Sequence, residues 1–174
     1  SEKDVPFNEI LQQAIDNGYT EPDPREDLCG NDVGRKLLIL ARELDLQNEF
    51  DEIKIQNLIP EHLREGSAAE FLPRLGEFDV VYDAIKKEQK PNHVLRYIGE
   101  LSGDLQNDKG NLEVKLVSVP SDTALGGLKG SDSFFEIYTE SYGDRPIVIQ
   151  GAGAGSAVTA RGVFGDILRL SDKG

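Results

Sequence analysis

The spacing of apolar residues changes near Pro91, and this change constrains the fold more than any other feature of the sequence. Before Pro91 apolar side chains recur every three or four residues, which is typical of amphipathic helices. Beyond it they recur in short runs separated by stretches rich in turn-forming residues, which is typical of strands. Helices first and clustered strands later predict an α+β fold. We expect a mixed, largely antiparallel sheet with helices packed on one face and the other face available for subunit or domain contact.

The same patterns give approximate bounds for each element. The expected helices cover residues 7–17, about 30–44, a short stretch from Ser67 that opens with a capping box, 80–87 and 156–170. The expected strands cover residues 53–58, 94–101, 112–119, 134–142 and 146–150, with a mobile hairpin loop at 102–110. The spacing of Val80, Val81, Ala84 and Ile85 indicates the helix at 80–87. On the last helix the side chains expected to be buried are Val158, Val163, Ile167 and Leu168.

The length, net charge and cysteine content of the chain limit its domain number and its possible partners. At 174 residues the chain can bury one core, so we expect residues 1–174 to form a single domain. A net charge of −13 argues against nucleic acid or an anionic membrane surface as partner. The sequence has no run of about 18 apolar residues and no signal-peptide pattern. Its one cysteine suits a reducing cytoplasm, and with only two scattered histidines it offers no plausible zinc site.

An acidic, proline-rich segment leads into the second predicted helix; we call residues 18–30 the strap. Pro22 and Pro24 fix their own φ angles and favour extended conformations in the residues before them, which makes this segment stiff. Within the helix that follows, Asp32 and Lys36 are four residues apart and therefore share one side. They lie at the edge of the apolar stripe, and this position predicts a half-sheltered charged pair that could hold a polar substrate.

Less specific interpretations of these residues stay open at this point. An Asp and a Lys at this spacing usually form a solvated helix pair worth about 0.3–0.5 kcal/mol. The spaced carboxylates of Glu21, Asp23 and Asp27 also suggest a calcium loop. However, prolines and an arginine occupy positions where such a loop needs small or ligating residues, and its turn glycine is missing.

A glycine-rich loop at residues 151–155 lies between a predicted strand and the last helix. Glycines and helix N-terminal amides suit phosphate binding. A dinucleotide fingerprint also needs a further strand with an acidic residue about 20 residues on, and the sequence here does not supply it. A tight turn with close backbone packing is the alternative. A Ser-His-Asp hydrolase is not supported, because the sequence has no G-x-S-x-G elbow.

Three stretches resemble one known family. They are GYTEPDPREDL over residues 18–28 with Gly30, Asp32, Val33, Arg35 and Lys36 after it, VLRYIG over residues 94–99, and GAGAG over residues 151–155 with Val158-Thr159-Ala160 and Gly162-Val163 after it. Together they resemble the homoserine dehydrogenases, specifically the C-terminal part that binds substrate and forms subunit contacts. The family's nucleotide-binding domain has no counterpart in this sequence. The resemblance therefore implies a fragment of a longer chain, in which fusion to an aspartokinase is one possibility.

The resemblance also implies roles for individual residues. Lys36 would donate a proton to the substrate oxygen or stabilise the developing alkoxide, and Asp32 would keep Lys36 charged and in place. Glu21 would bind the α-ammonium group of the substrate, a function that Asp32 could share. Asp27 and Tyr19 would shape the same pocket.

The implied reaction is the NAD(P)H-dependent reduction of L-aspartate 4-semialdehyde to L-homoserine, on the route to threonine and methionine. Gly18 and Gly155 would border the nicotinamide end of NADP or NAD, which the missing domain would mainly hold, so the fragment alone should be inactive. The expected partners are this substrate pair, the missing domain and a second copy of the chain. A stand-alone dimerising module that binds an amino acid without redox chemistry is the alternative.

Overall fold

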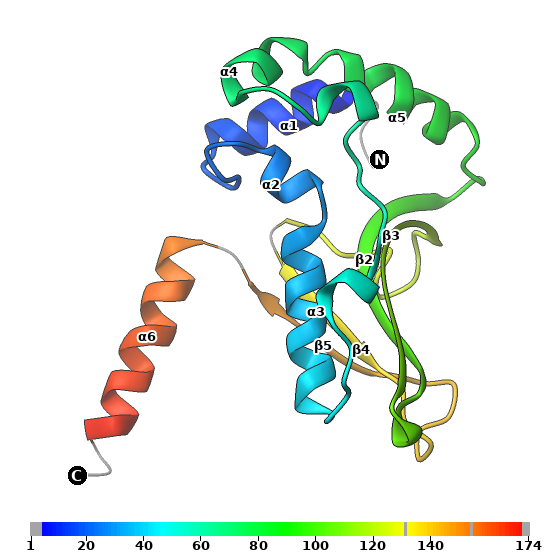
Figure 1. Ribbon diagram of the computed structural model, residues 1–174, viewed down its shortest axis with the longest axis vertical. Coiled ribbons are helices and arrows are strands. Elements are labelled where there is room, and N and C mark those ends of the chain that lie inside the picture. Colours follow the sequence, from blue (N-terminus) through cyan, green and yellow to red (C-terminus); the bar gives the residue numbers. More distant parts are fainter. Residues whose placement is uncertain (1–4, 131, 154, 172–174) are drawn as a thin grey trace. The chain divides into compact units, whose positions relative to one another are not determined.

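The computed structural model describes residues 5–130, 132–153 and 155–171, and the chain divides into two compact units, residues 1–120 and 121–174. The helices of the first unit are α1 (Phe7–Asp16), α2 (Arg25–Leu28), α3 (Asn31–Glu43), α4 (Ala68–Phe71) and α5 (Glu77–Lys87) (Figure 1). Its strands are β1 (Lys54–Ile55), β2 (His93–Asp104) and β3 (Lys109–Pro120). The second unit contains β4 (Asp132–Ile137), β5 (Ile147–Ala152) and α6 (Ser156–Ser171). Helices therefore precede most strands, and the α+β prediction is confirmed.

A mixed three-stranded sheet forms the centre of the first unit. Its order is β1-β3-β2, with β3 antiparallel to β2 and parallel to β1. The predicted 102–110 loop is mostly strand, because β2 and β3 pair as far as Asp104 and Lys109 and leave only a tight turn. The predicted strand at 53–58 is correct only for β1. Beyond it the side chain of Gln56, rather than its backbone, accepts the Leu116 amide at 2.8 Å, and this ends the regular ladder.

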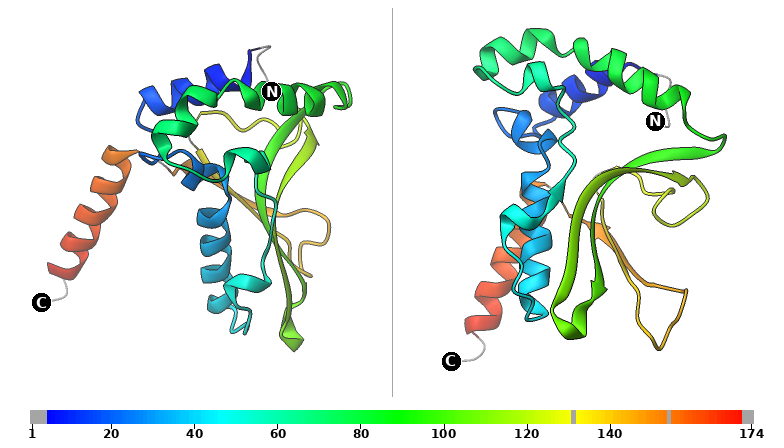
Figure 2. Two further views of the ribbon diagram at one scale, coloured as in Figure 1. Left: turned by 45° about the horizontal axis from the view of Figure 1, so that its top comes forward. Right: turned by 45° about the vertical axis from the view of Figure 1, so that its right-hand side comes forward.

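Helix α3 covers one face of this sheet, as the two further views in Figure 2 show. Gly99 of β2 makes this close packing possible, since a Cβ there would lie 3.1 Å from Val33 and 3.6 Å from Leu37. The buried residues of this first core are Leu37, Ala41, Leu46, Ile53, Leu112 and Val114. The opposite face carries charged side chains. There Lys115 Nζ lies 3.0 Å from Glu100 Oε2 and 2.6 Å from Glu113 Oε2. The prediction that helices pack on one face of the sheet is confirmed.

A second core lies where α1, α4 and α5 come together. Its buried residues are Leu11, Ile59, Leu63, Phe71, Leu75, Phe78 and Tyr82. The helix predicted at 80–87 is present as part of α5, but the valines that indicated it are not on its buried side, because Val80 is 76% exposed and Val81 is also exposed. Phe78 and Tyr82 are buried instead, and Phe7 stacks on Tyr82 with ring centroids 3.9 Å apart. The larger aromatic side chains, four residues apart, determine which side of α5 faces inward.

The second unit is a hairpin followed by a helix. Strands β4 and β5 pair antiparallel, and α6 begins directly after the glycine-rich loop. The last predicted helix is thus present, but the prediction that its apolar side is buried was wrong for this chain. Val158, Val163, Ile167 and Leu168 are all exposed, as is Phe164. A two-stranded hairpin offers too little apolar surface to cover this helix. Single-domain organisation of residues 1–174 stays a prediction.

Candidate functional site

The strap begins where glycine ends α1. Gly18 has a left-handed φ of 68°, and its amide and that of Tyr19 close the helix by donating to Ile15 and Ala14 carbonyls at 2.9 Å each. Glycine adopts this conformation without steric cost, which explains the sharp turn at this point. Tyr19 is 63% exposed, so its ring is available to a ligand.

Hydrogen bonds within the strap hold its acidic residues in place. The backbone N–H of Glu21 donates to Asp27 Oδ2 at 2.9 Å, which leaves the Glu21 carboxylate exposed and its backbone fixed. The short helix α2, which contains Asp27, was not predicted from the sequence. It places Asp27 where it can reach back six residues to Glu21. In this structure Asp27 therefore orients Glu21, in addition to any contact of its own with a ligand.

The first two turns of α3 carry a second pair of charged residues. Lys36 Nζ lies 2.7 Å from Asp32 Oδ2, which confirms that the two residues share one side of the helix. Their side chains are 72% and 57% exposed, so the pair is more open to solvent than the helical pattern predicts. Among the described residues no hydrogen bond or ion pair joins this pair to Glu21 or Asp27. The two pairs form separate charged groups at the two ends of one short segment.

Gly30 is the structural junction between the strap and α3. It is the N-terminal cap of the helix, with a left-handed φ of 83°. A side chain at this position would collide with the Tyr97 hydroxyl and would lie 2.8 Å from Ile55 Cγ2. That hydroxyl donates to the Gln56 carbonyl at 2.7 Å, and burial raises the pKa of Tyr97 to about 12. The sequence indicated Gly30 as the approximate start of this helix and as part of the family signature, but Tyr97 was not identified as its neighbour.

The two glycines predicted to border a cofactor, Gly18 and Gly155, lie in different units. Both have left-handed φ angles, 68° and 119°, and a Cβ at either would meet nothing within 4 Å. Open space beside a glycine backbone fits the close approach of a flat ring. Ala154 of the same loop lies outside the described residues. That these two glycines border a cofactor stays a prediction.

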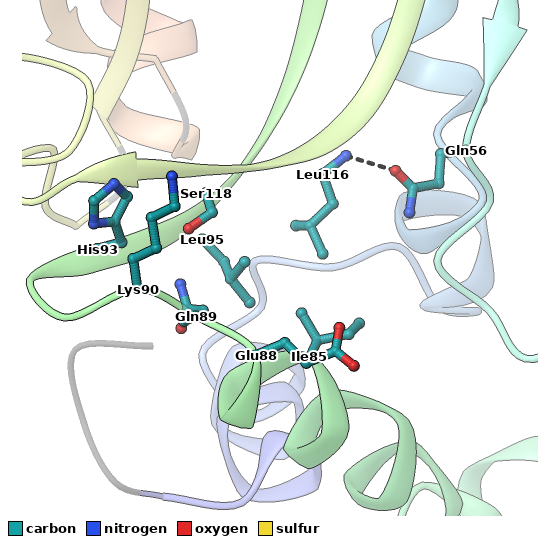
Figure 3. Close-up of a pocket in the computed structure, with 9 residues that line it drawn as sticks. All are labelled: Gln56, Ile85, Glu88, Gln89, Lys90, His93, Leu95, Leu116 and Ser118. Atoms are coloured by element: carbon teal, nitrogen blue, oxygen red, sulfur yellow. Dashed lines mark hydrogen bonds between the residues drawn. The ribbon is translucent and has the colours of Figure 1, made fainter.

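Two cavities of the described structure lie away from these residues. One of about 400 Å³ lies between the end of α5 and the sheet, lined by Gln56, Ile85, Glu88, Gln89, Lys90, His93, Leu95, Leu116 and Ser118 (Figure 3). Another, of about 310 Å³, lies beside α1 and is lined by Asn8, Glu9, Gln12, Leu72, Pro73, Leu75 and Gly76. Neither contains a predicted site residue. The strap and the start of α3 form an exposed polar surface.

Two features are absent from the described residues. Among residues 5–130, 132–153 and 155–171 no group of three His, Cys, Asp or Glu side chains converges as metal ligands. Within the same ranges no helix combines the length and apolar character needed to cross a bilayer.

The ion pair between Asp23 and Arg25 makes the stability of the strap depend on pH. Hydrogen bonds from Arg25 lower the pKa of Asp23, while partial burial acts in the opposite direction. A lowered folded pKa stabilises the fold above the ordinary aspartate pKa of about 3.9, and this contribution is lost as the pH falls through the folded value. We expect Asp23→Asn to lower the free energy of unfolding at pH 7 and to flatten its decline between about pH 5 and pH 2.

Urea unfolding across this pH range measures the effect. Asp144→Asn, at an exposed position in the second unit, removes the same charge without touching Arg25 and serves as the control. Parallel pH curves for wild type and Asp23→Asn would show that the pair does not contribute.

Comparison with known proteins gives a consistent assignment. A sequence model of the homoserine dehydrogenase family matches residues 1–168. A homoserine dehydrogenase from Paracoccidioides brasiliensis is 44% identical over 170 residues, which are 96% of this chain and 45% of that protein. A bifunctional chloroplastic aspartokinase/homoserine dehydrogenase from Daucus carota is 45% identical over 171 residues, which are 96% of this chain and 18% of that protein.

Solved structures show the same fold. A Candida auris protein of unknown function is 36% identical with a TM-score of 0.80, and the match covers 98% of this chain and 47% of that one. An S. aureus homoserine dehydrogenase at 20% identity has a TM-score of 0.63, with 96% of this chain and 37% of that one covered. The chain thus spans less than half the length of these relatives. With a family match over residues 1–168, it belongs to the homoserine dehydrogenase family.

Proposed function

We propose that this chain is the substrate-binding part of a longer homoserine dehydrogenase, which interconverts L-aspartate 4-semialdehyde and L-homoserine with NADP or NAD. The observation that carries this proposal is the family match over residues 1–168, which includes both the Glu21–Asp27 and the Asp32–Lys36 pairs. The substrate has an α-ammonium group at one end and an aldehyde or hydroxyl oxygen at the other. A carboxylate complements the charge of the α-ammonium group, and a lysine ammonium group can donate a hydrogen bond to the oxygen at the other end.

In this proposal the protein binds the substrate and transfers one proton to or from its oxygen. Glu21 accepts hydrogen bonds from the α-ammonium group, while Asp27 holds the backbone of Glu21 and Tyr19 forms a wall of the pocket. Lys36 donates a proton to the carbonyl oxygen during reduction and takes it back in the reverse direction. Asp32, 2.7 Å from Lys36 Nζ, orients that amine. The bound nicotinamide cofactor supplies the hydride, and Gly18 and Gly155 leave room beside it.

The exposed apolar side of α6 supports the proposed partner. Val163, Phe164, Ile167 and Leu168 are each about half exposed or more. Large apolar side chains gathered on one side of a helix usually pack against another surface. We assign this surface to the nucleotide-binding part of the same polypeptide, and we assign the ionic face of the β1-β3-β2 sheet to a second copy in a homodimer. One cysteine fits a reducing compartment such as the cytoplasm, and the name of the Daucus carota relative places that protein in the chloroplast.

The missing nucleotide-binding part makes a direct prediction about activity. We expect the isolated 174-residue chain to give no homoserine-dependent reduction of NADP⁺ or NAD⁺, and the full-length polypeptide to give a readily measured rate. Absorbance at the wavelength of the reduced nicotinamide measures both. Turnover by the isolated chain would contradict the proposal that the nucleotide-binding part of the polypeptide is required for the reaction. A folded full-length protein that binds homoserine without turnover would support an amino-acid-binding module instead.

A further inference from the structure

Arg25 lies at the centre of the strap. It belongs to neither of the residue pairs of the proposed site, Glu21–Asp27 and Asp32–Lys36. Its side chain is only 12% exposed, which is unusual for an arginine. The Nη2 atom lies 2.6 Å from Asp23 Oδ2, and Nε lies 3.0 and 3.1 Å from the two Asp23 oxygens. This is the two-point geometry that makes an arginine–carboxylate pair strong and directional.

The remaining donors of Arg25 reach a distant part of the chain. Nη2 donates to the carbonyl of Gly66 at 2.9 Å, and Nη1 donates to those of Glu65 and Arg64 at 3.2 and 3.4 Å. The guanidinium also lies over the Phe71 ring, 5.1 Å from its centroid. One side chain thus joins the strap to the loop that precedes α4, about forty residues later.

That loop is itself held firmly. Gly66 has a φ of 90°, and Ser67 and Glu70 form a reciprocal capping box at the start of α4. Phe71 is part of the second core, where it meets Phe78 edge-on. Pro24, directly before Arg25, is fully buried. The contacts of Arg25 therefore connect the exposed acidic strap to a rigid, packed part of the unit.

We propose that Arg25 is a positioning residue that fixes the strap, and through it Glu21, for binding of the substrate ammonium group. This inference rests on the proposed function. The path runs from Arg25 through Asp23 and α2 to Asp27, whose carboxylate holds the Glu21 amide at 2.9 Å. A lysine at position 25 keeps the charge but cannot donate to the Asp23 carboxylate and three carbonyls together. The strap of Arg25→Lys is then free to move.

The kinetic test uses the full-length polypeptide. We expect Arg25→Lys to raise the KM for homoserine about tenfold with a smaller change in kcat and an unchanged KM for NADP⁺. A loss of stability alone would lower the active fraction and leave KM unchanged. Arg42→Lys is the matched control, because Arg42 donates to the Asn48 carbonyl and the Glu49 carboxylate at an exposed position near the end of α3. In a Glu21→Gln background, Arg25→Lys should change KM little further, since the two residues act as one unit.

A second measurement does not depend on turnover. Trypsin cleaves after both arginine and lysine, so the bond after residue 25 stays a substrate in Arg25→Lys. We expect cleavage there to be about tenfold faster than in wild type, with cleavage after Arg42 unchanged, because only the strap is released. Should Arg25→Lys fail to fold, Asp23→Asn weakens the same clamp and should move both readouts in the same direction.

The outcomes separate the two proposals. A wild-type polypeptide that folds but shows no homoserine oxidation overturns the proposed function, and the trypsin comparison still decides whether Arg25 holds the strap. An active wild type with an unchanged homoserine KM in Arg25→Lys overturns the positioning role. So does a KM effect of the same size in the wild-type and Glu21→Gln backgrounds.

Discussion

Replacing Lys36 by Ala in the full-length polypeptide is expected to lower kcat by about 10²–10⁴-fold, the usual contribution of a positioned acid or base. Reduction of an aldehyde needs one proton at the oxygen that becomes the hydroxyl, and Lys36 is our candidate donor. Because the alanine variant retains Glu21, it should still bind homoserine, so its KM should change far less than its kcat. Steady-state rates in both directions measure the effect.

Arg35, the residue before Lys36 on α3, provides the control. Arg35 projects toward Phe50, with its guanidinium carbon 5.9 Å from the ring centroid. Arg35→Ala therefore removes a positive charge of α3 without removing the proposed proton donor, and we expect its kcat to stay near that of wild type. A kcat for Lys36→Ala as high as that of Arg35→Ala would remove Lys36 from the chemistry.

Replacing Gly30 by Ala is expected to reduce the free energy of unfolding by about 2–4 kcal/mol, the range of backbone strain combined with overpacking. The left-handed φ of 83° disfavours alanine, and the added Cβ would collide with the Tyr97 hydroxyl and lie 2.8 Å from Ile55 Cγ2. Any shift that relieves this collision moves the start of α3, which carries Asp32 and Lys36. The variant should therefore lose activity as well as stability. Urea unfolding together with steady-state kinetics measures both.

Gly143→Ala is the control, because it introduces the backbone strain without the collision. Gly143 also has a left-handed φ, 59°, but a Cβ there would meet nothing within 4 Å. Its expected cost is about 1 kcal/mol, the strain alone. Adding Tyr97→Phe to Gly30→Ala removes the hydroxyl and should recover part of the loss. Equal destabilisation by the two alanine variants would show that Tyr97 and Ile55 do not confine Gly30.

The sequence was sufficient where a pattern depends on neighbours in the chain. Gly18 ends α1, the capping box of Ser67 and Glu70 opens α4, and Asp32 and Lys36 pair along α3 at 2.7 Å. Each of these features involves residues at most four apart, so local geometry determines it. The change of apolar spacing near Pro91 likewise predicted the order of helices and strands.

Features that depend on distant partners could not be predicted. The spacing that indicated α5 includes Val80, which is exposed, whereas Phe78 and Tyr82 are buried because Phe7, far away in the sequence, stacks against them. The Arg25 side chain reaches carbonyls about forty residues later, and no spacing rule indicates such a contact. The exposure of the apolar side chains of α6 was likewise not predicted, because the helical spacing shows which side of a helix is apolar but not what covers it.

Bound homoserine in a crystal structure of the full-length polypeptide tests the central claim most directly. We predict its α-ammonium group within hydrogen-bonding distance of the Glu21 carboxylate and its hydroxyl oxygen within the same distance of Lys36 Nζ. Homoserine bound elsewhere, or Glu21 and Lys36 too far apart to contact one four-carbon molecule, would contradict the account.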